Sequence, residues 1–66
     1  MGGMILVYEN IKTKAAEQGM TIERVSKLSG IGRKSMVEWN RHSPSADSLH
    51  AVAKVLGTTV EELLKD

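Results

Sequence analysis

Apolar residues recur three or four positions apart in five short segments of the chain, and a glycine or a proline turn closes each of the first four segments. This spacing is the period of an amphipathic α-helix. Helices of about 7–12 residues are not stable alone in water, so these segments must bury their apolar stripes against one another. The sequence therefore predicts an all-α fold, a compact domain of five helices.

The expected helix ends follow from capping residues. The first helix should cover residues 8–18, and Gly19 ends it. The expected N-caps of the later helices are Thr21, Gly32, Ser45 and Thr59, and Thr59 with Glu62 three residues on has the pattern of a capping box. The predicted core stripes are Tyr8, Ile11 and Ala15; Ile22, Val25 and Leu28; Met36 and Trp39; Leu49, Val52, Ala53 and Leu56; and Val60, Leu63 and Leu64.

The length and composition exclude several classes of protein. The 66 residues suffice for one small domain, and the absence of cysteine removes disulfides and cysteine-ligated metals. His42 and His50 are too isolated to indicate a metal site, and no nucleophile, base and orienting group recur at usable spacing. We therefore expect no enzyme activity, no cofactor, no metal and no small-molecule ligand.

The longest apolar run, Met4 to Tyr8, is far shorter than the ~20 residues that span a bilayer. No basic stretch precedes it, so we expect no signal peptide and no membrane partner, and we place the protein in the cytoplasm. Residues 1–7 are interpreted as an N-terminal arm that is partly an expression remnant or disordered. Two alternatives remain for the apolar run: an added helical turn with Met4, Tyr8 and Ile11 on one face, which we favour, or an arm in a dimer contact.

Charge is concentrated in the middle of the chain. Residues 24–42 contain five cations and a single acid, Glu38, whereas the flanking segments are mildly acidic. A cationic segment between acidic ends is typical of an anion-binding surface. The alternative is a solvated face with scattered charges.

The second and third predicted helices are joined by a short turn that contains Gly30, which indicates a helix-turn-helix. In this motif the N-terminal residues of the second helix reach the bases in the major groove. Arg33 and Lys34 occupy that position, where arginine can donate two hydrogen bonds to guanine and lysine can contact guanine or phosphate. Met36 and Trp39 would then fix the helix to the core, and we expect Trp39 to be buried rather than to stack on bases. In the alternative, both cations are ordinary solvated charges.

Two stretches, MTIERVSKLSGIGRKSMVEW and SPSADSLHAVAKVLGTTVEELL, resemble the Xre-type, lambda-repressor-like DNA-binding family, closest in style to short phage-derived repressors. The resemblance implies a helix-turn-helix domain over residues 8–66 and a sequence-specific regulator of transcription, in particular a repressor. The helix at about residues 33–41 would lie in the major groove. Because one small domain buries only about 600–1,000 Å² on DNA, useful affinity predicts a homodimer on a pseudo-palindromic duplex operator. The alternative is a protein-interaction module of the same fold, such as an antitoxin-like subunit.

The resemblance also implies site residues. Base contacts are expected from Arg33, Lys34, Ser35 and Glu38, and phosphate contacts from Thr21, Ile22, Gly32, Arg41, His42 and Ser43. Apart from the resemblance, Lys27 is expected to flank the DNA and to contact phosphate rather than bases. Glu38 has two open roles, as an acceptor from cytosine N4 or as a partner of Lys34 one turn earlier. Ser35 either contacts DNA or only fills the helix. Protonation of His42 at low pH is expected to strengthen its phosphate contact.

The sequence departs from the family pattern at several positions. Ile22 stands where many members have glutamine, so only its backbone N–H is available to a phosphate. The segment WNRHSP is shorter than the usual loop and lacks its glycine. Ala15 and Asn40 stand where members often pair an arginine with an acid, and the loss of both avoids an unpaired buried charge. The last predicted helix, with Val60, Leu63 and Leu64, is either a dimer surface or plain core.

Overall fold

Five α-helices follow one another in residues 6–65, the part of the chain that the computed structural model describes, and this part contains no strand. They are α1 (Val7–Glu17), α2 (Ile22–Ser29), α3 (Arg33–Glu38), α4 (Ala46–Val55) and α5 (Val60–Leu63). The prediction of an all-α domain with five helices is confirmed. The largest difference in bounds is at α3, which ends at Glu38 and not near residue 41.

The helix starts are set by local side-chain caps. The side-chain oxygens of Thr21, Ser45 and Thr59 each accept a hydrogen bond from the backbone N–H three residues on, as predicted. The capping box at Thr59 is only half formed. A complete box would turn the carboxylate of Glu62 back to Thr59, but that carboxylate lies 3.6 Å from Nζ of Lys14 on α1.

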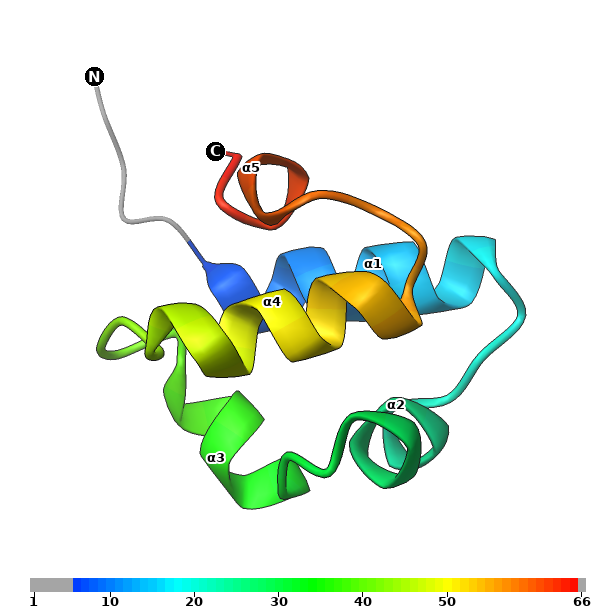
Figure 1. Ribbon diagram of the computed structural model, residues 1–66, viewed down its shortest axis with the longest axis horizontal. Coiled ribbons are helices and arrows are strands. Elements are labelled where there is room, and N and C mark those ends of the chain that lie inside the picture. The colour runs from blue at the N-terminus through cyan, green and yellow to red at the C-terminus, as the bar shows by residue number, and fades with distance from the viewer. Residues whose placement is uncertain (1–5, 66) are drawn as a thin grey trace.

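Helices α1 and α4 lie between α5 on one side and the pair α2 and α3 on the other (Figure 1). The core therefore forms where all five helices face inward. Its largest fully buried side chains are Ile11, Val25, Met36, Val52, Leu56 and Leu63. The buried residues within 6–65 are all hydrophobic, and no buried side-chain nitrogen or oxygen there lacks a hydrogen-bond partner, so the interior is apolar.

The prediction that Leu28 belongs to the core stripe of α2 is wrong, because 53% of its surface is exposed. Val25 is fully buried, and the half-buried residues Ile22, Ser26 and Ser29 all lie to one side of it on the helix. At about 100° per residue, Leu28 lies about 60° to the other side. Helix α2, which packs on α4, is therefore rotated so that its small serines face inward and Leu28 faces water.

The start of α1 differs slightly from the prediction. Val7 is buried and shares a face with Ile11 and Ala15, whereas Tyr8 is only half-buried. Val7 therefore belongs to α1 and to the core. The predicted burial of Met4 lies outside the described residues.

Two amide side chains satisfy helix ends that no local cap reaches. The N-cap of α1, Leu6, has no capping side chain, but Oδ1 of Asn40 accepts a hydrogen bond from the N–H of Tyr8 at 3.0 Å. At the other end, Nε2 of Gln18 donates to the carbonyl of Leu56, at the end of α4, at 2.7 Å. Both bonds join residues more than 30 positions apart and so fix the helices relative to one another. Within residues 6–65 no helix is long and apolar enough to cross a bilayer.

Candidate nucleic-acid interface

The turn between α2 and α3 is held by two serines of α2. Oγ of Ser26 donates to the carbonyl of Ile31 at 2.7 Å, and the N–H of Ile31 donates to Oγ of Ser29 at 3.2 Å. Gly30 adopts φ +77°, a conformation that strains any residue with a side chain. These contacts fix the angle at which α3 leaves α2. The sequence analysis missed them, although two hydroxyl residues in the last turn before a glycine are a signal for such bonds.

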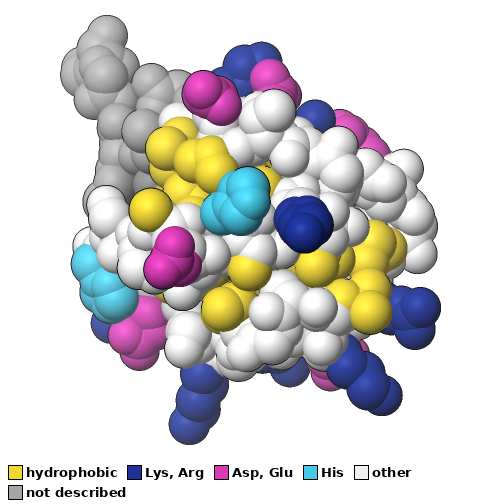
Figure 2. Space-filling view, in the orientation of Figure 1, with side chains coloured by type: hydrophobic (Ala, Val, Ile, Leu, Met, Phe, Trp, Pro, Cys, Tyr) yellow, Lys and Arg dark blue, Asp and Glu magenta, His cyan; other side chains and the backbone are white. Residues whose placement is uncertain are grey.

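Helix α3 is anchored on one face and open on the other. Met36 is fully buried and Trp39 is 6% exposed, so both predicted anchors are confirmed. Arg33, Lys34 and Glu38 are exposed. In Figure 2, Lys and Arg side chains project along the lower edge of the molecule, where α2 and α3 lie in Figure 1. Cations of residues 24–42 are therefore exposed on this side of the molecule, with the acids Glu23 and Glu38 near them.

Arg33 and Lys34 differ in their surroundings. The guanidinium of Arg33 lies 3.7 Å from the carboxylate of Glu23 near the start of α2. Lys34 forms no ion pair with any residue of the described range 6–65. Because both side chains of the Arg33 pair are mostly exposed, the pair is weak and screened by salt. Both cations therefore remain available to an external anion.

Glu38 pairs with a residue other than the one predicted. Its carboxylate oxygen lies 3.4 Å from Nε2 of His42, one turn later, and within residues 6–65 it makes no ion pair with Lys34. That alternative is wrong. The contact with His42 is an ion pair only when the imidazole is protonated, so Glu38 can still accept a hydrogen bond from outside.

Three of the predicted phosphate contacts lie at the starts of α2 and α3. Oγ1 of Thr21 accepts from the N–H of Arg24 at 3.1 Å, which leaves the hydroxyl proton to donate to a phosphate oxygen. Ile22 is half-buried and offers only its backbone N–H. Gly32 is the exposed N-cap of α3, and no atom lies within 4 Å of the place where a Cβ would stand. A backbone of this kind can be approached closely.

The other predicted phosphate contacts lie at the ends of the same two helices. Lys27 is exposed in the last turn of α2. Arg41, His42 and Ser43 are exposed just after α3, where the N–H groups of Arg41 and His42 both donate to the carbonyl of Glu38. The short segment that replaces the usual loop is therefore tied to the end of α3.

Val37 is an exposed residue of α3 that the sequence analysis did not assign to any role. Its side chain is 45% exposed, and with Arg33, Lys34 and Glu38 it lines a shallow hollow on the outer face of α3. The available signal was its place in the helix, one position after Met36 and so off the core stripe.

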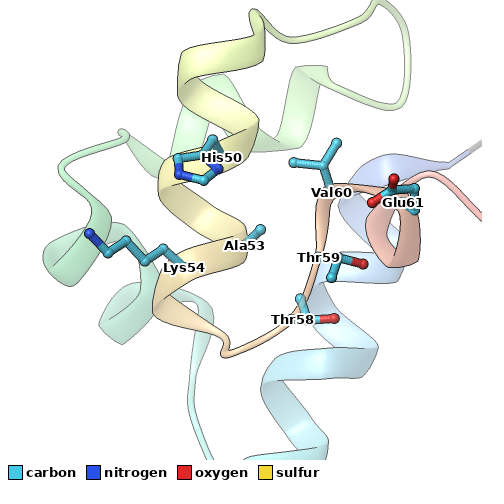
Figure 3. Close-up of a pocket in the computed structure, with 7 residues that line it drawn as sticks. All are labelled: His50, Ala53, Lys54, Thr58, Thr59, Val60 and Glu61. Carbon is cyan, nitrogen blue, oxygen red and sulfur yellow. The ribbon is translucent and has the colours of Figure 1, made fainter.

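A second hollow lies between α4 and the segment that leads to α5 (Figure 3). Ala53 and Val60 give it an apolar floor, His50 and Lys54 border it from α4, and Glu61 borders it from α5. Of the predicted dimer residues, Leu63 is fully buried core, whereas Val60 is half-buried and Leu64 is 38% exposed. In the part of the chain that is described, no three His, Cys, Asp or Glu side chains cluster to hold a metal.

A short helix with a buried anchor face, joined by a fixed glycine turn to the helix before it and exposing adjacent cations, defines a helix-turn-helix domain of the DNA-binding class. The Cro/C1-type HTH DNA-binding domain family matches residues 10–66, nearly the whole chain, and the chain belongs to this family. The resemblance to Xre-type, lambda-repressor-like proteins is thus confirmed. No curated protein matches the chain. A domain of this type is typical of regulators that are not enzymes.

Proposed function

We propose that the chain is a sequence-specific regulator of transcription that binds double-stranded DNA and reads the major groove with α3. The observation that carries this proposal is the arrangement of α3, in which buried Met36 and Trp39 fix the helix while Arg33 and Lys34 are exposed at its start. The N-terminal residues of such a helix are the ones that reach base edges. Repression is the proposed effect, because a protein bound across a promoter excludes polymerase from it.

The proposal gives the exposed residues separate roles. Base contacts come from Arg33, Lys34, Ser35 and Glu38, and phosphate contacts come from Thr21, Ile22, Lys27, Gly32, Arg41, His42 and Ser43. Arginine can donate a bidentate pair of hydrogen bonds to O6 and N7 of guanine, and Glu38 can accept from N4 of cytosine. Phosphate contacts fix the register of the protein on the duplex and carry no sequence information directly.

We further propose that the protein acts in the cytoplasm as a homodimer on a pseudo-palindromic operator. One small module buries only about 600–1,000 Å² on DNA, so two copies on half-sites about 34 Å apart are needed for useful affinity. The hollow beside α4 suits a contact with a second copy. Lys54 and Glu61 border it from opposite sides (Figure 3), and a two-fold axis would bring each cation of one copy to the acid of the other.

The test is selection of bound sequences from a random duplex pool, followed by fluorescence anisotropy of the selected duplex. Affinity should fall steeply with salt as counterions return to the phosphates. Arg33→Ala and Lys34→Ala should each cost about 1–3 kcal/mol and relax base preference at one position. Lys65→Ala is the matched control, because Lys65 follows α5 on the side of the molecule away from α3 (Figure 1).

Phosphate contacts predict a different pattern. Lys27→Ala and Arg41→Ala should weaken binding to all sequences alike and reduce the salt slope by about 1. His42→Gln should likewise weaken binding to all sequences alike, because a phosphate contact carries no sequence information directly. Salt-independent or absent duplex binding would instead favour a protein-interaction module, and an unchanged base preference in Arg33→Ala would remove α3 as the reading helix.

A further inference from the structure

Val37 has no evident role in folding. The side chain of this residue is nearly half exposed in a helix of six residues whose anchors are Met36 and Trp39. Valine is also a poor helix former, because its branched side chain loses rotamer freedom in a helix. Neither burial nor local propensity explains an isopropyl group at this position.

The direction of Val37 on α3 is outward. Successive residues of a helix are about 100° apart, and the direction opposite the Met36 and Trp39 face nearly coincides with Lys34. Val37 lies about 50° to one side of this direction, and Glu38 lies about 50° to the other side. Arg33 lies about 90° from this direction on the side of Val37, and Ser35 lies about 110° from it on the side of Glu38. Val37 is therefore better placed than Ser35 to meet a surface that α3 faces.

Its neighbours are charged. Val37 lines the shallow hollow on α3 together with Arg33, Lys34 and Glu38, so it is an apolar spot inside a polar and largely cationic rim. A ligand that matches this surface has one exposed apolar group, and around this group it has negative charges and hydrogen-bonding atoms. In the major groove of a duplex, the apolar group at the base edges is the C5 methyl of thymine.

We propose that Val37 contacts the C5 methyl group of a thymine, and so specifies one base pair of the operator without a hydrogen bond. This inference rests on the proposed function. Val37 lies one helical turn after Arg33, about 6 Å along the axis of α3, and base pairs are about 3.4 Å apart. The thymine therefore lies within two base pairs of the guanine that Arg33 contacts.

The experiment uses the duplex selected by the wild-type protein, in which each thymine is replaced in turn by deoxyuridine. This change removes only the methyl group. Wild-type affinity should fall about fourfold at one position in each half-site, which is the effect of one buried methyl group, and much less elsewhere. The base pair that Arg33 contacts is located in parallel from the position at which Arg33→Ala loses its preference.

Val37→Ala should bind the thymine duplex more weakly than the wild type does. Its affinity should not change when uracil replaces thymine at that position. Cytosine placed there should bind wild type about fourfold better when it is methylated at C5, and Val37→Ala should not distinguish the two. Leu28→Ala is the matched control, because it removes another exposed apolar side chain outside α3 and should keep the full response to uracil. Circular dichroism of each variant checks the fold.

The outcomes separate the two proposals. A wild-type protein that selects no duplex overturns the proposed function and this inference with it. A protein that selects an operator but tolerates uracil at every thymine overturns the inference alone, and so does a Val37→Ala variant as sensitive to uracil as wild type. A sensitive thymine more than two base pairs from the Arg33 contact also overturns it.

Discussion

The guanidinium of Arg33 lies 3.7 Å from the carboxylate of Glu23, so the first residue of α3 is paired with an acid on the helix before it. The two residues lie on different helices of the motif, and the fixed turn between α2 and α3 keeps them close. A guanidinium has five donors, so Arg33 can keep this partner while two other donors reach a base. Glu23 therefore biases the direction of Arg33 only weakly, and it also adds a negative charge near the proposed phosphate contacts.

Glu23→Gln should therefore change two quantities in opposite directions, the affinity for any duplex and the preference for guanine. Loss of the charge should tighten binding to any duplex by about two- to fivefold, the range of exposed charge pairs. Loss of this weak bias should slightly lower the preference for guanine at the position that Arg33 is proposed to contact. Both quantities come from anisotropy with the selected duplex and with versions changed at that position. Glu17→Gln, an exposed acid near the end of α1, should change neither, and an unchanged guanine preference in Glu23→Gln would contradict the role given to Glu23.

The turn of the motif depends on the bond from Ser26 to the carbonyl of Ile31. Ser26→Ala leaves this half-buried carbonyl without its partner, so the free energy of unfolding should fall by about 1–2 kcal/mol in urea titrations. DNA affinity should fall further than stability alone explains, because α3 is less firmly oriented. Thr13→Ala removes a comparable hydroxyl bond on the exposed face of α1 and should be nearly neutral. Equal stability of the two variants would show that the turn does not need the serine.

Asn40 caps α1 across the fold by accepting a hydrogen bond from the N–H of Tyr8. Asn40→Ala should cost about 1 kcal/mol of stability, as loss of an N-cap does, whereas exposed Ser43→Ala should cost little. Asn40→Asp should hold α1 at neutral pH, because a carboxylate is favoured at a helix N-terminus. This places the folded-state pKa of the new carboxyl below its unfolded value. Its stabilisation is therefore present above the unfolded pKa and lost as pH falls through the folded pKa. Urea titrations across this range check the sign.

The sequence could predict the features that depend on residues close to one another along the chain. The caps at Thr21, Ser45 and Thr59 bond three residues ahead, and the anchors Met36 and Trp39 follow from helical spacing. The exposure of Leu28 depends on how α2 is rotated against α4, and the helical pattern of α2 alone allows either rotation. The packing of α2 against α4 determines which rotation occurs, and in that rotation Leu28 is exposed.

The site shows the same division. Arg33 and Lys34 could be placed from the turn and the helix that follows it, because both are local features. The partner of Glu38 could not be chosen, since Lys34 and His42 are equally one turn away on either side. The cap from Asn40 to Tyr8 joins residues 32 positions apart, and no local pattern predicts a bond of that kind.

The proposed dimer contact makes a prediction about Lys54 and Glu61, which border the hollow beside α4. If two copies meet there about a two-fold axis, each pairing occurs twice, so Lys54→Glu or Glu61→Lys alone should weaken dimerisation on the order of tenfold. The double variant exchanges the charges and should restore most of the loss. Sedimentation equilibrium at low salt, without DNA, measures all four proteins, and Lys12→Glu on the exposed face of α1 is the control. A double variant as weak as the singles would place the contact elsewhere, because a charge exchange rescues only residues that face each other.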